Sequence, residues 1–401
     1  MKQEELIEFY EAKSALEGFI TPLFKEGFTI ANITASILVG AECSTFLPPL
    51  SDKVLELEVF NKNKKIVLVI IDSLRYDYAL KYSSKIPRVE MKPIVSTAPS
   101  TTVTALTSIS YASSPSLHAM LGYKMLLKEC GGVVRILDFT SAAVSQKESL
   151  KDSLVDLSKL VDEKTVFEKL SEKNYKTFFL VRKGLCETSF TKLLSKGAIC
   201  QEYFTLPHMF VKIAKHLREH EEVFIYAYYG ALDAISHENG PFSEEYRKEV
   251  ENIFYWIKVF TEELAPKNGY TLLIIADHGQ IPIREQHIVD IRTLDLYKEL
   301  KVPPFGESRF TYFIAEKEFL FKGLESIAEV HTVKELVEKK VFGEKFSEKF
   351  WERAGTYVAL ALEDYCLVHP FTKKDLEFKP KGHHGGLSKE EMIVPLMSLV
   401  A

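Results

Sequence analysis

Short apolar runs that alternate with amphipathic segments restrict the fold of this chain more than any other feature. Between about Ile66 and Asp290, runs rich in β-branched and aromatic residues alternate with segments of helical periodicity, the longest from Ser243 to Leu264. Runs of this length and composition are typical of buried strands. Strands that alternate with helices favour a mostly parallel sheet covered by helices, so the predicted fold class is α/β, with the sequence VRILDF among the expected sheet strands.

The pattern divides the chain into three expected parts. Residues 1–62 form a predicted helical N-terminal extension, and residues 63–290 and 375–401 form the predicted core. Residues 291–374 break the alternation and are predicted to form an inserted α+β cap subdomain. Pro395, inside the last apolar run, indicates an edge strand or a bulge, because proline cannot donate a hydrogen bond to a sheet.

Carboxylates and imidazoles stand at or just past the ends of several predicted strands. In open α/β sheets, ligands gather beyond the carboxyl ends of the strands, so these side chains are expected to converge although they lie far apart in sequence. Carboxylate and imidazole groups together suit divalent metals, and six of them could hold two ions. The six residues are Asp72, Asp233, His237, Asp277, His278 and His384.

A hydroxyl-rich stretch, Ala98 to Thr107, follows the first of these carboxylates. It lies after Pro99 at the start of a predicted helix, where free backbone N–H groups favour an anion such as phosphate. A hydroxyl is a poor nucleophile at neutral pH unless a metal or a base lowers its pKa. Hydroxyls beside metal ligands therefore indicate phosphoryl transfer, with Thr101 and Thr102 as candidate nucleophiles.

These motifs together carry a family resemblance. The chain resembles the alkaline phosphatase superfamily, and most closely its nucleotide pyrophosphatase/phosphodiesterase (type I phosphodiesterase) branch. It departs from the family pattern at Tyr111-Ala112 and His118-Ala119, where the family has Thr-Gly and His-Gly. The motifs, in chain order, are Asp72 after an apolar run, Pro99-Ser100-Thr101-Thr102, Pro115 with His118, Asp233-x-x-x-His237 with Gly240-Pro241, Asp277-His278-Gly279, and Gly382-His383-His384-Gly385-Gly386.

The resemblance implies a three-layer α/β/α sandwich and a hydrolase that uses two divalent metals, Zn²⁺ or alternatively Mn²⁺ or Fe²⁺. Thr102 resembles the nucleophile that forms a phosphothreonine intermediate, because Pro115 and His118 follow it in the family register; Thr101 is the alternative. His384 is preferred to His383 because the family's histidine directly precedes glycine. Carried over residue by residue, Asp72, Thr102, Asp277 and His278 match one metal, and Asp233, His237 and His384 match the other.

The expected substrate is a small phosphodiester or a nucleotide pyrophosphate. Family members specialised for monoesters resemble one another in placing an acid beside the nucleophile that helps to bind a third cation, and residues 97–116 contain no Asp or Glu. Arg75 could bind a phosphate oxygen and replace that cation, but pairing with Asp77 is the favoured interpretation.

Each residue alone also has an ordinary explanation, since an Asp after a strand often caps a helix or forms a turn. The alternatives are a phosphomonoesterase or a phosphomutase on the same scaffold, and a non-catalytic binding protein that retains the fold.

Composition narrows the possible partners and the compartment. A net charge of -5 provides no basic surface for bulk nucleic acid. No apolar run is long enough to span a membrane, and the five cysteines show no CxxC spacing. We therefore expect a cytoplasmic protein with reduced thiols and no membrane partner. The sequence does not indicate an oligomeric state.

Overall fold

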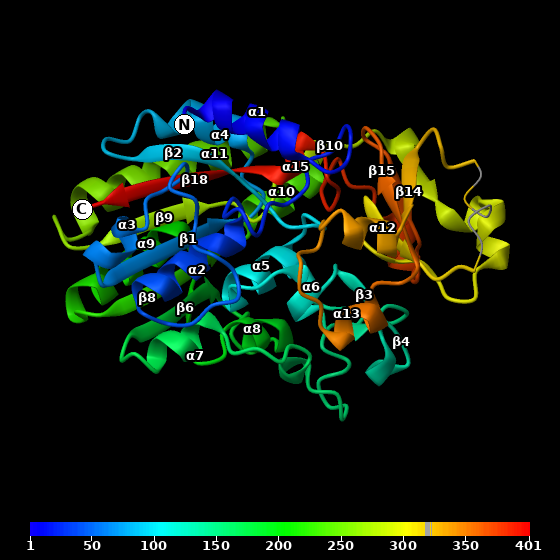
Figure 1. Ribbon diagram of the computed structural model, residues 1–401, viewed down its shortest axis with the longest axis horizontal. Helices are drawn as coiled ribbons and strands as arrows, with labels where there is room; N and C mark the ends of the chain where they lie inside the picture. The colour runs from blue at the N-terminus through cyan, green and yellow to red at the C-terminus, as the bar shows by residue number, and fades with distance from the viewer. Residues whose placement is uncertain (317–320, 322) are drawn as a thin grey trace.

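The computed structural model describes residues 1–316, 321 and 323–401 of the chain. Its centre is a seven-stranded sheet in the order β2-β18-β9-β1-β8-β6-β7 (Figure 1). The β9, β1, β8, β6 and β7 strands are parallel to one another, and β18 runs antiparallel to its two neighbours, β2 and β9. The strands are Lys65–Ile71 (β1), Glu90–Val95 (β2), Lys176–Arg182 (β6), Ile199–Tyr203 (β7), Val223–Tyr229 (β8), Thr271–Ile275 (β9) and Ile393–Val400 (β18).

Helices cover both faces of this sheet, which confirms the predicted α/β class and the predicted three-layer α/β/α sandwich (Figure 1). The α2, α5 and α7 helices pack together on one face, and α4, α9 and α11 on the other. The helices of this part are Gln3–Lys13 (α1), Ile30–Gly40 (α2), Glu58–Lys62 (α3), Tyr76–Ser83 (α4), Thr102–Tyr111 (α5), Pro115–His118 (α6), Val166–Ser171 (α7), Ser189–Leu194 (α8), Leu206–Glu219 (α9), Ala231–Asn239 (α10), Glu244–Val259 (α11) and Lys389–Met392 (α15).

The position of β18 corrects one expectation. Pro395 does not lie on an edge strand, because β18 is paired on both sides. It faces Pro93 of β2, and the pairing with β9 begins only at the next residue, Leu396. Proline is tolerated inside this sheet because it stands just outside the ladder with β9.

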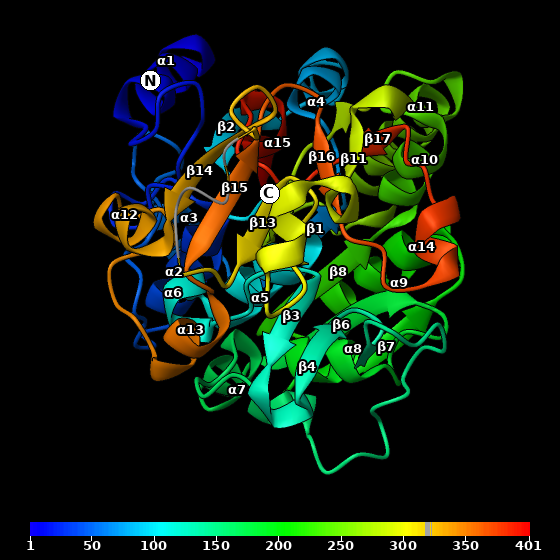
Figure 2. The same ribbon diagram turned by 90° about the vertical axis from the view of Figure 1, so that its right-hand side faces the viewer.

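A second seven-stranded sheet lies beside the core, in the order β14-β15-β13-β12-β3-β4-β5 (Figure 2). Its strands come from residues 124–141 as well as from residues 305–361, so the segment 291–374 does not build this sheet alone. The VRILDF sequence was expected in the central sheet, but its first residues belong to β4 of the second sheet. The strands are Lys124–Leu127 (β3), Gly132–Arg135 (β4), Thr140–Ser141 (β5), Phe305–Gly306 (β12), Phe310–Phe313 (β13), Ala328–Thr332 (β14) and Tyr357–Ala361 (β15).

Short elements complete this part of the molecule, and the domain boundaries given above remain a proposal. Two small strand pairs, β10 with β17 and β11 with β16, link the segments around the second sheet. Their bounds and those of the remaining helices are Ile281–Pro282 (β10), Ile288–Asp290 (β11), Cys366–Val368 (β16), Gly382–His383 (β17), Val333–Glu338 (α12), Glu348–Arg353 (α13) and Lys373–Glu377 (α14).

A buried ion pair joins the second sheet to the core. Arg309, just before β13, donates from Nε to Glu391 Oε1 at 2.8 Å and from Nη2 to Oε2 at 3.1 Å. Glu391 also accepts the Gly386 N–H at 2.8 Å, next to the His384 loop. A side chain at Gly386 would meet the Glu391 carboxylate at 2.7 Å, so only glycine fits there. The pair therefore fixes the loop that carries His384.

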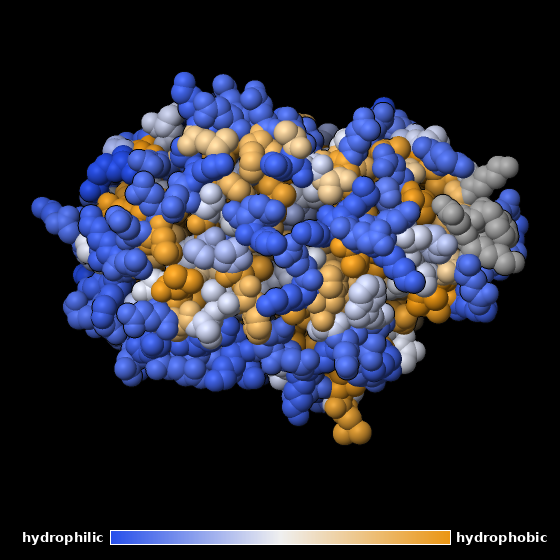
Figure 3. Space-filling model, viewed as in Figure 1, coloured by the Kyte–Doolittle hydropathy of each residue, from blue (hydrophilic) through white to orange (hydrophobic). Residues whose placement is uncertain are grey.

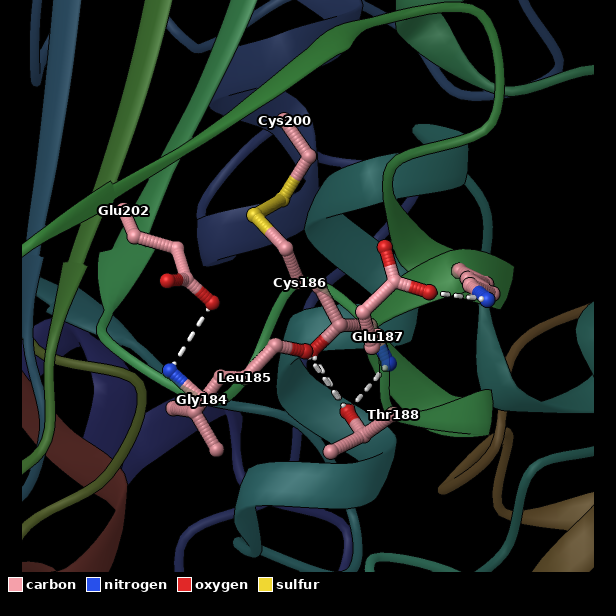
Figure 4. Close-up of a disulfide and its surroundings, with 9 residues drawn as sticks. Gly184, Leu185, Cys186, Glu187, Thr188, Cys200 and Glu202 are labelled. Carbon is pink, nitrogen blue, oxygen red and sulfur yellow. Dashed lines mark hydrogen bonds and ion pairs between the residues drawn. A yellow bond between two sulfur atoms is a disulfide. The ribbon is translucent and has the colours of Figure 1, made fainter.

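A disulfide joins Cys186 to Cys200 and corrects the expectation of five reduced thiols (Figure 4). It connects the segment after β6 to β7. Disulfides are typical of oxidising compartments, so this bond removes one support for the expected cytoplasmic location, which stays a prediction. Spacing could not reveal the pair, because the fold alone brings these two cysteines together.

The face seen in Figure 3 is covered mostly by hydrophilic side chains. Within the described residues, no helix is both long enough and apolar enough to cross a membrane.

We expect Glu391→Gln to destabilise the protein by about 3–5 kcal/mol, because it leaves a buried guanidinium without its charged partner. Glu390→Gln, at the exposed neighbouring position, should change stability by less than about 0.5 kcal/mol. Urea denaturation of both variants measures this, and equal stabilities would contradict the assigned role.

The same pair should make stability depend on pH in acid. Burial alone would raise the pKa of Glu391, but the charge of Arg309 and the hydrogen bonds that the carboxylate accepts together outweigh burial and lower the pKa. A group whose folded pKa is depressed contributes stability above its unfolded pKa, about 4.3 for glutamate, and loses it as the pH falls through the folded pKa. Wild-type stability should therefore fall below about pH 4 more steeply than that of Glu391→Gln.

Candidate two-metal site

Three neighbouring strands of the central sheet bring the expected ligands to one edge. Asp72 directly follows β1, Asp277 lies two residues after β9, and Asp233 lies in the first turn of α10, which follows β8. The strand order β9-β1-β8 makes these positions adjacent. His237 stands one helical turn after Asp233, so both side chains share a face of α10.

The first cluster contains Asp72, Asp277 and His278, all buried. His278 Nε2 lies 3.4 Å from Asp72 Oδ1 and 3.5 Å from Asp277 Oδ2. Within the described part of the chain, neither of these two carboxylate oxygens has a hydrogen-bond partner. Tyr228 of β8 donates its hydroxyl to the other oxygen of Asp72.

The second cluster contains Asp233, His237 and His384. Asp233 Oδ1 lies 3.3 Å from His237 Nε2 and 3.7 Å from His384 Nε2. The two clusters adjoin, because the rings of His278 and His384 stack with centroids 3.7 Å apart. Gln280 donates its amide to Asp233 and thereby orients it.

The three histidines turn the same nitrogen toward the carboxylates. Nδ1 of His237 faces the Gly382 carbonyl at 2.8 Å, Nδ1 of His278 faces its neighbouring carbonyl at 3.0 Å, and Nδ1 of His384 faces the Ser100 carbonyl at 3.2 Å. A carbonyl can only accept, so Nδ1 carries the proton and Nε2 keeps a free lone pair. This is the usual arrangement of metal-binding histidines.

His383 differs from its neighbour. Its Nδ1 accepts the His384 N–H at 2.9 Å, and its Nε2 lies 2.8 Å from the Ser308 hydroxyl. Both ring nitrogens are engaged, which supports His384 as the proposed ligand although His383 lies in one of the possible metal-binding groups.

The electrostatics of the site fit cations. Burial, and then the carboxylates of Asp277 and Asp233, raise the pKa of Asp72 well above its ordinary value. Burial lowers the pKa of His384 well below that of free histidine, so its imidazole stays neutral. Clustered carboxylates with unpaired oxygens and neutral imidazoles are the donor set that divalent metals prefer.

Thr102 is the first residue of α5, and its hydroxyl lies 3.2 Å from His278 Nε2. Thr101 precedes it at the N-cap position, where its side chain makes no capping hydrogen bond. Both line the cavity beside the clusters, but the hydrogen bond directs Thr102 toward the predicted ligands. This geometry supports Thr102 over Thr101 as the proposed nucleophile.

A cavity of about 780 Å³ opens beside the two clusters and ends at the second sheet. Glu307, a buried residue between β12 and β13, lines it and was not expected from the sequence. Burial raises the pKa of Glu307 to about 7. The cavity wall also includes Asp72, Thr101, Thr102, Leu106, Tyr123, Lys124, Arg135, Phe190, Asp233, His237, Phe378 and His384.

Arg75 forms the ion pair that the sequence interpretation favoured. Its Nε and Nη2 each donate to Asp77 at 3.0 Å, and its Nη1 donates to the Gln280 carbonyl at 2.5 Å. Phe242 covers the guanidinium at 4.6 Å. Arg75 is also absent from the described cavity wall, so a role in substrate binding gains no support.

Sequence reasoning missed Tyr228, Gln280 and Glu307. Gln280 could have been predicted from the sequence, because it directly follows the Asp277-His278-Gly279 motif. Tyr228 sits in an aromatic strand where only the fold shows which ring faces the site. No local pattern marks Glu307.

Comparisons with known proteins agree with this geometry. The family model of type I phosphodiesterase / nucleotide pyrophosphatase matches residues 66–386. The chain therefore belongs to this family, within the alkaline phosphatase superfamily, and is a hydrolase. No curated protein matches its sequence.

Solved structures share the fold at low sequence identity. Murine ectonucleotide pyrophosphatase / phosphodiesterase 5 superposes with a TM-score of 0.62 at 15% identity, over 84% of this chain and 88% of that chain. Phosphonoacetate hydrolase from Sinorhizobium meliloti 1021, in complex with phosphonoformate, gives a TM-score of 0.60 at 17% identity, over 85% of this chain and 91% of that chain.

We expect Thr102→Ala to lower turnover by about a thousandfold or more while the protein stays folded. The substitution removes one hydroxyl at a helix start that faces the cavity. Thr101→Ala is the matched control and should retain most activity. Loss of activity in Thr101→Ala with activity kept in Thr102→Ala would move the nucleophile by one residue.

Proposed function

We propose that this protein hydrolyses small phosphodiesters or nucleotide pyrophosphates through a phosphothreonine intermediate at Thr102, with two divalent metals. The observation that carries the proposal is the Thr102 hydroxyl, 3.2 Å from His278 Nε2 at the junction of two carboxylate–imidazole clusters. A separate line of support is a murine relative with the same fold, which has been solved as an inactive form in complex with AMP.

Each proposed metal would be held by its own set of side chains. Asp72, Asp277, His278 and Thr102 would hold one metal, and Asp233, His237 and His384 would hold the other. When bound, the ions would lower the pKa of the attacking oxygens and neutralise charge on the phosphoryl group. We propose Zn²⁺, with Mn²⁺ or Fe²⁺ as alternatives, because the ligands mix nitrogen and oxygen donors.

The reaction has two displacements at phosphorus. Thr102 Oγ1 gives its proton to solvent and forms a bond to phosphorus, while the bond from phosphorus to the leaving oxygen breaks and that oxygen departs with the electron pair. Water then forms a new bond to phosphorus as the bond to Thr102 breaks, and a proton given up by this water restores the Thr102 hydroxyl. The cavity beside the clusters has room for the ester group that stays on phosphorus or for the leaving group.

The position of Glu307 keeps phosphomonoester hydrolysis open as an alternative function. The stretch 97–116 lacks an acid, but the second sheet brings the Glu307 carboxyl to Thr101. An acid beside the nucleophile is therefore present in space although it is missing from the sequence motif. No described residue singles out phosphomutase chemistry.

We expect kcat/KM for bis(p-nitrophenyl) phosphate and for thymidine 5′-monophosphate p-nitrophenyl ester to exceed that for p-nitrophenyl phosphate by about tenfold or more. Two metals suit a phosphorus centre with one negative charge better than a dianion. All three substrates release p-nitrophenol, so one assay compares them. A clear preference for the monoester would refute diester specificity and leave the two-metal site standing.

A further inference from the structure

Glu307 occupies a fixed position at the tip of the hairpin between β12 and β13. Its N–H donates to the Phe310 carbonyl at 3.0 Å, and its carbonyl accepts from the Phe310 N–H at 3.3 Å and from the Thr311 hydroxyl at 2.8 Å. The residue is 7% exposed. The hairpin therefore holds one carboxyl group in a defined place.

That place is beside the proposed nucleophile. Oε1 of Glu307 accepts the Tyr123 N–H at 2.6 Å, and the carboxyl also interacts with the Thr101 hydroxyl. The side chain packs on the His384 loop, since a Cβ at Gly385 would lie 2.8 Å from Glu307 Cβ. Gly385 has a φ of +109°, so both its backbone and this contact require glycine.

Within the described part of the chain, no Lys, Arg or His side chain forms an ion pair with the Glu307 carboxylate, which accepts the Tyr123 N–H instead. The charge of Lys124, another residue of the cavity wall, acts on the Glu307 carboxyl, but the ammonium group of Lys124 donates instead to the His369 carbonyl at 3.2 Å. An ionised Glu307 therefore presents unbalanced charge toward the site.

A fixed carboxylate distinguishes phosphoryl groups by their charge. A diester carries one negative charge, whereas a monoester carries nearly two above its second pKa of about 6. Placing like charges together is unfavourable and is a common way to exclude the wrong ligand. The second charge of a monoester would meet Glu307 in addition to the three ligand aspartates.

We propose that Glu307 is a specificity-determining residue whose carboxylate disfavours doubly charged phosphoryl groups and so selects singly charged diesters and anhydrides. This proposal rests on the proposed function of the site. It differs from a cation-binding role for the same acid, which would favour dianions instead.

The test is Glu307→Gln, compared with Glu307→Asp and with wild type in the metal-loaded full chain at pH 8.5. Glutamine keeps an acceptor for the Tyr123 N–H and removes the charge, whereas aspartate keeps the charge. We expect Glu307→Gln to raise the ratio of kcat/KM for p-nitrophenyl phosphate to that for bis(p-nitrophenyl) phosphate by about tenfold. Glu307→Asp should stay closer to the wild-type ratio.

An unchanged ratio, or equal loss of both activities, would overturn the proposal and assign Glu307 a structural role. A fall in the ratio would also overturn it and indicate that the carboxylate helps to hold a cation for dianions. Either result leaves the phosphohydrolase function intact.

Calorimetry provides a second measurement that does not need turnover. Inorganic phosphate is a dianion at pH 8.5, and dimethyl phosphate is a monoanion. Glu307→Gln should bind phosphate several-fold more tightly than wild type, with little change for dimethyl phosphate. Unchanged phosphate binding would overturn the proposal about Glu307. A complete lack of ester hydrolysis would instead refute the proposed function, and the binding measurement would still test the role of Glu307.

Discussion

The proposed site depends on buried carboxylates that lie close to one another and repel. Asp72 and Asp277 lie against His278 with unpaired oxygens, and Asp233 stands close enough to add to the field. A buried carboxylate without a partner is unfavourable unless it is protonated, paired or bound to a metal. The neutral imidazoles, turned with Nε2 inward by three backbone carbonyls, cannot supply the missing charge. Bound cations would offset this repulsion beside the Thr102 hydroxyl, which α5 holds 3.2 Å from His278 Nε2.

The two sheets share the construction of the site. The central sheet supplies the aspartates and α5, while the second sheet supplies the outer cavity wall and Glu307. Arg309 and Glu391 join these parts and hold Gly386, so the loop of His384 depends on an ion pair outside the site. The loop that carries the proposed ligand His384 therefore contacts both this ion pair and Glu307.

The sequence predicted what depends on local pattern. Periodic apolar runs indicated the parallel sheet, and motif order indicated the family, and both were confirmed. The structure explains why the family has glycine where this chain has Ala112 and Ala119. Both alanines follow the last residue of a helix and have a positive φ, 48° at Ala112 and 54° at Ala119. Glycine is favoured at such left-handed positions, which accounts for the family pattern.

What the sequence could not predict depends on contacts between distant segments. The VRILDF run was assigned to the wrong sheet, because the local sequence of a strand does not determine which strands it pairs with. The pairing of Cys186 with Cys200 and the reach of Glu307 to Thr101 follow from the fold alone. The metal-ligand roles remain predictions, which the geometry supports. The domain boundaries also remain predictions, and the geometry leaves them open.

Anomalous scattering from crystals of the metal-loaded protein shows directly whether two metals bind at this site. We expect two peaks about 4 Å apart. One should lie among Asp72, Asp277, His278 and Thr102, and the other among Asp233, His237 and His384. A single peak, or metals bound away from these side chains in a catalytically active protein, would contradict the two-metal account.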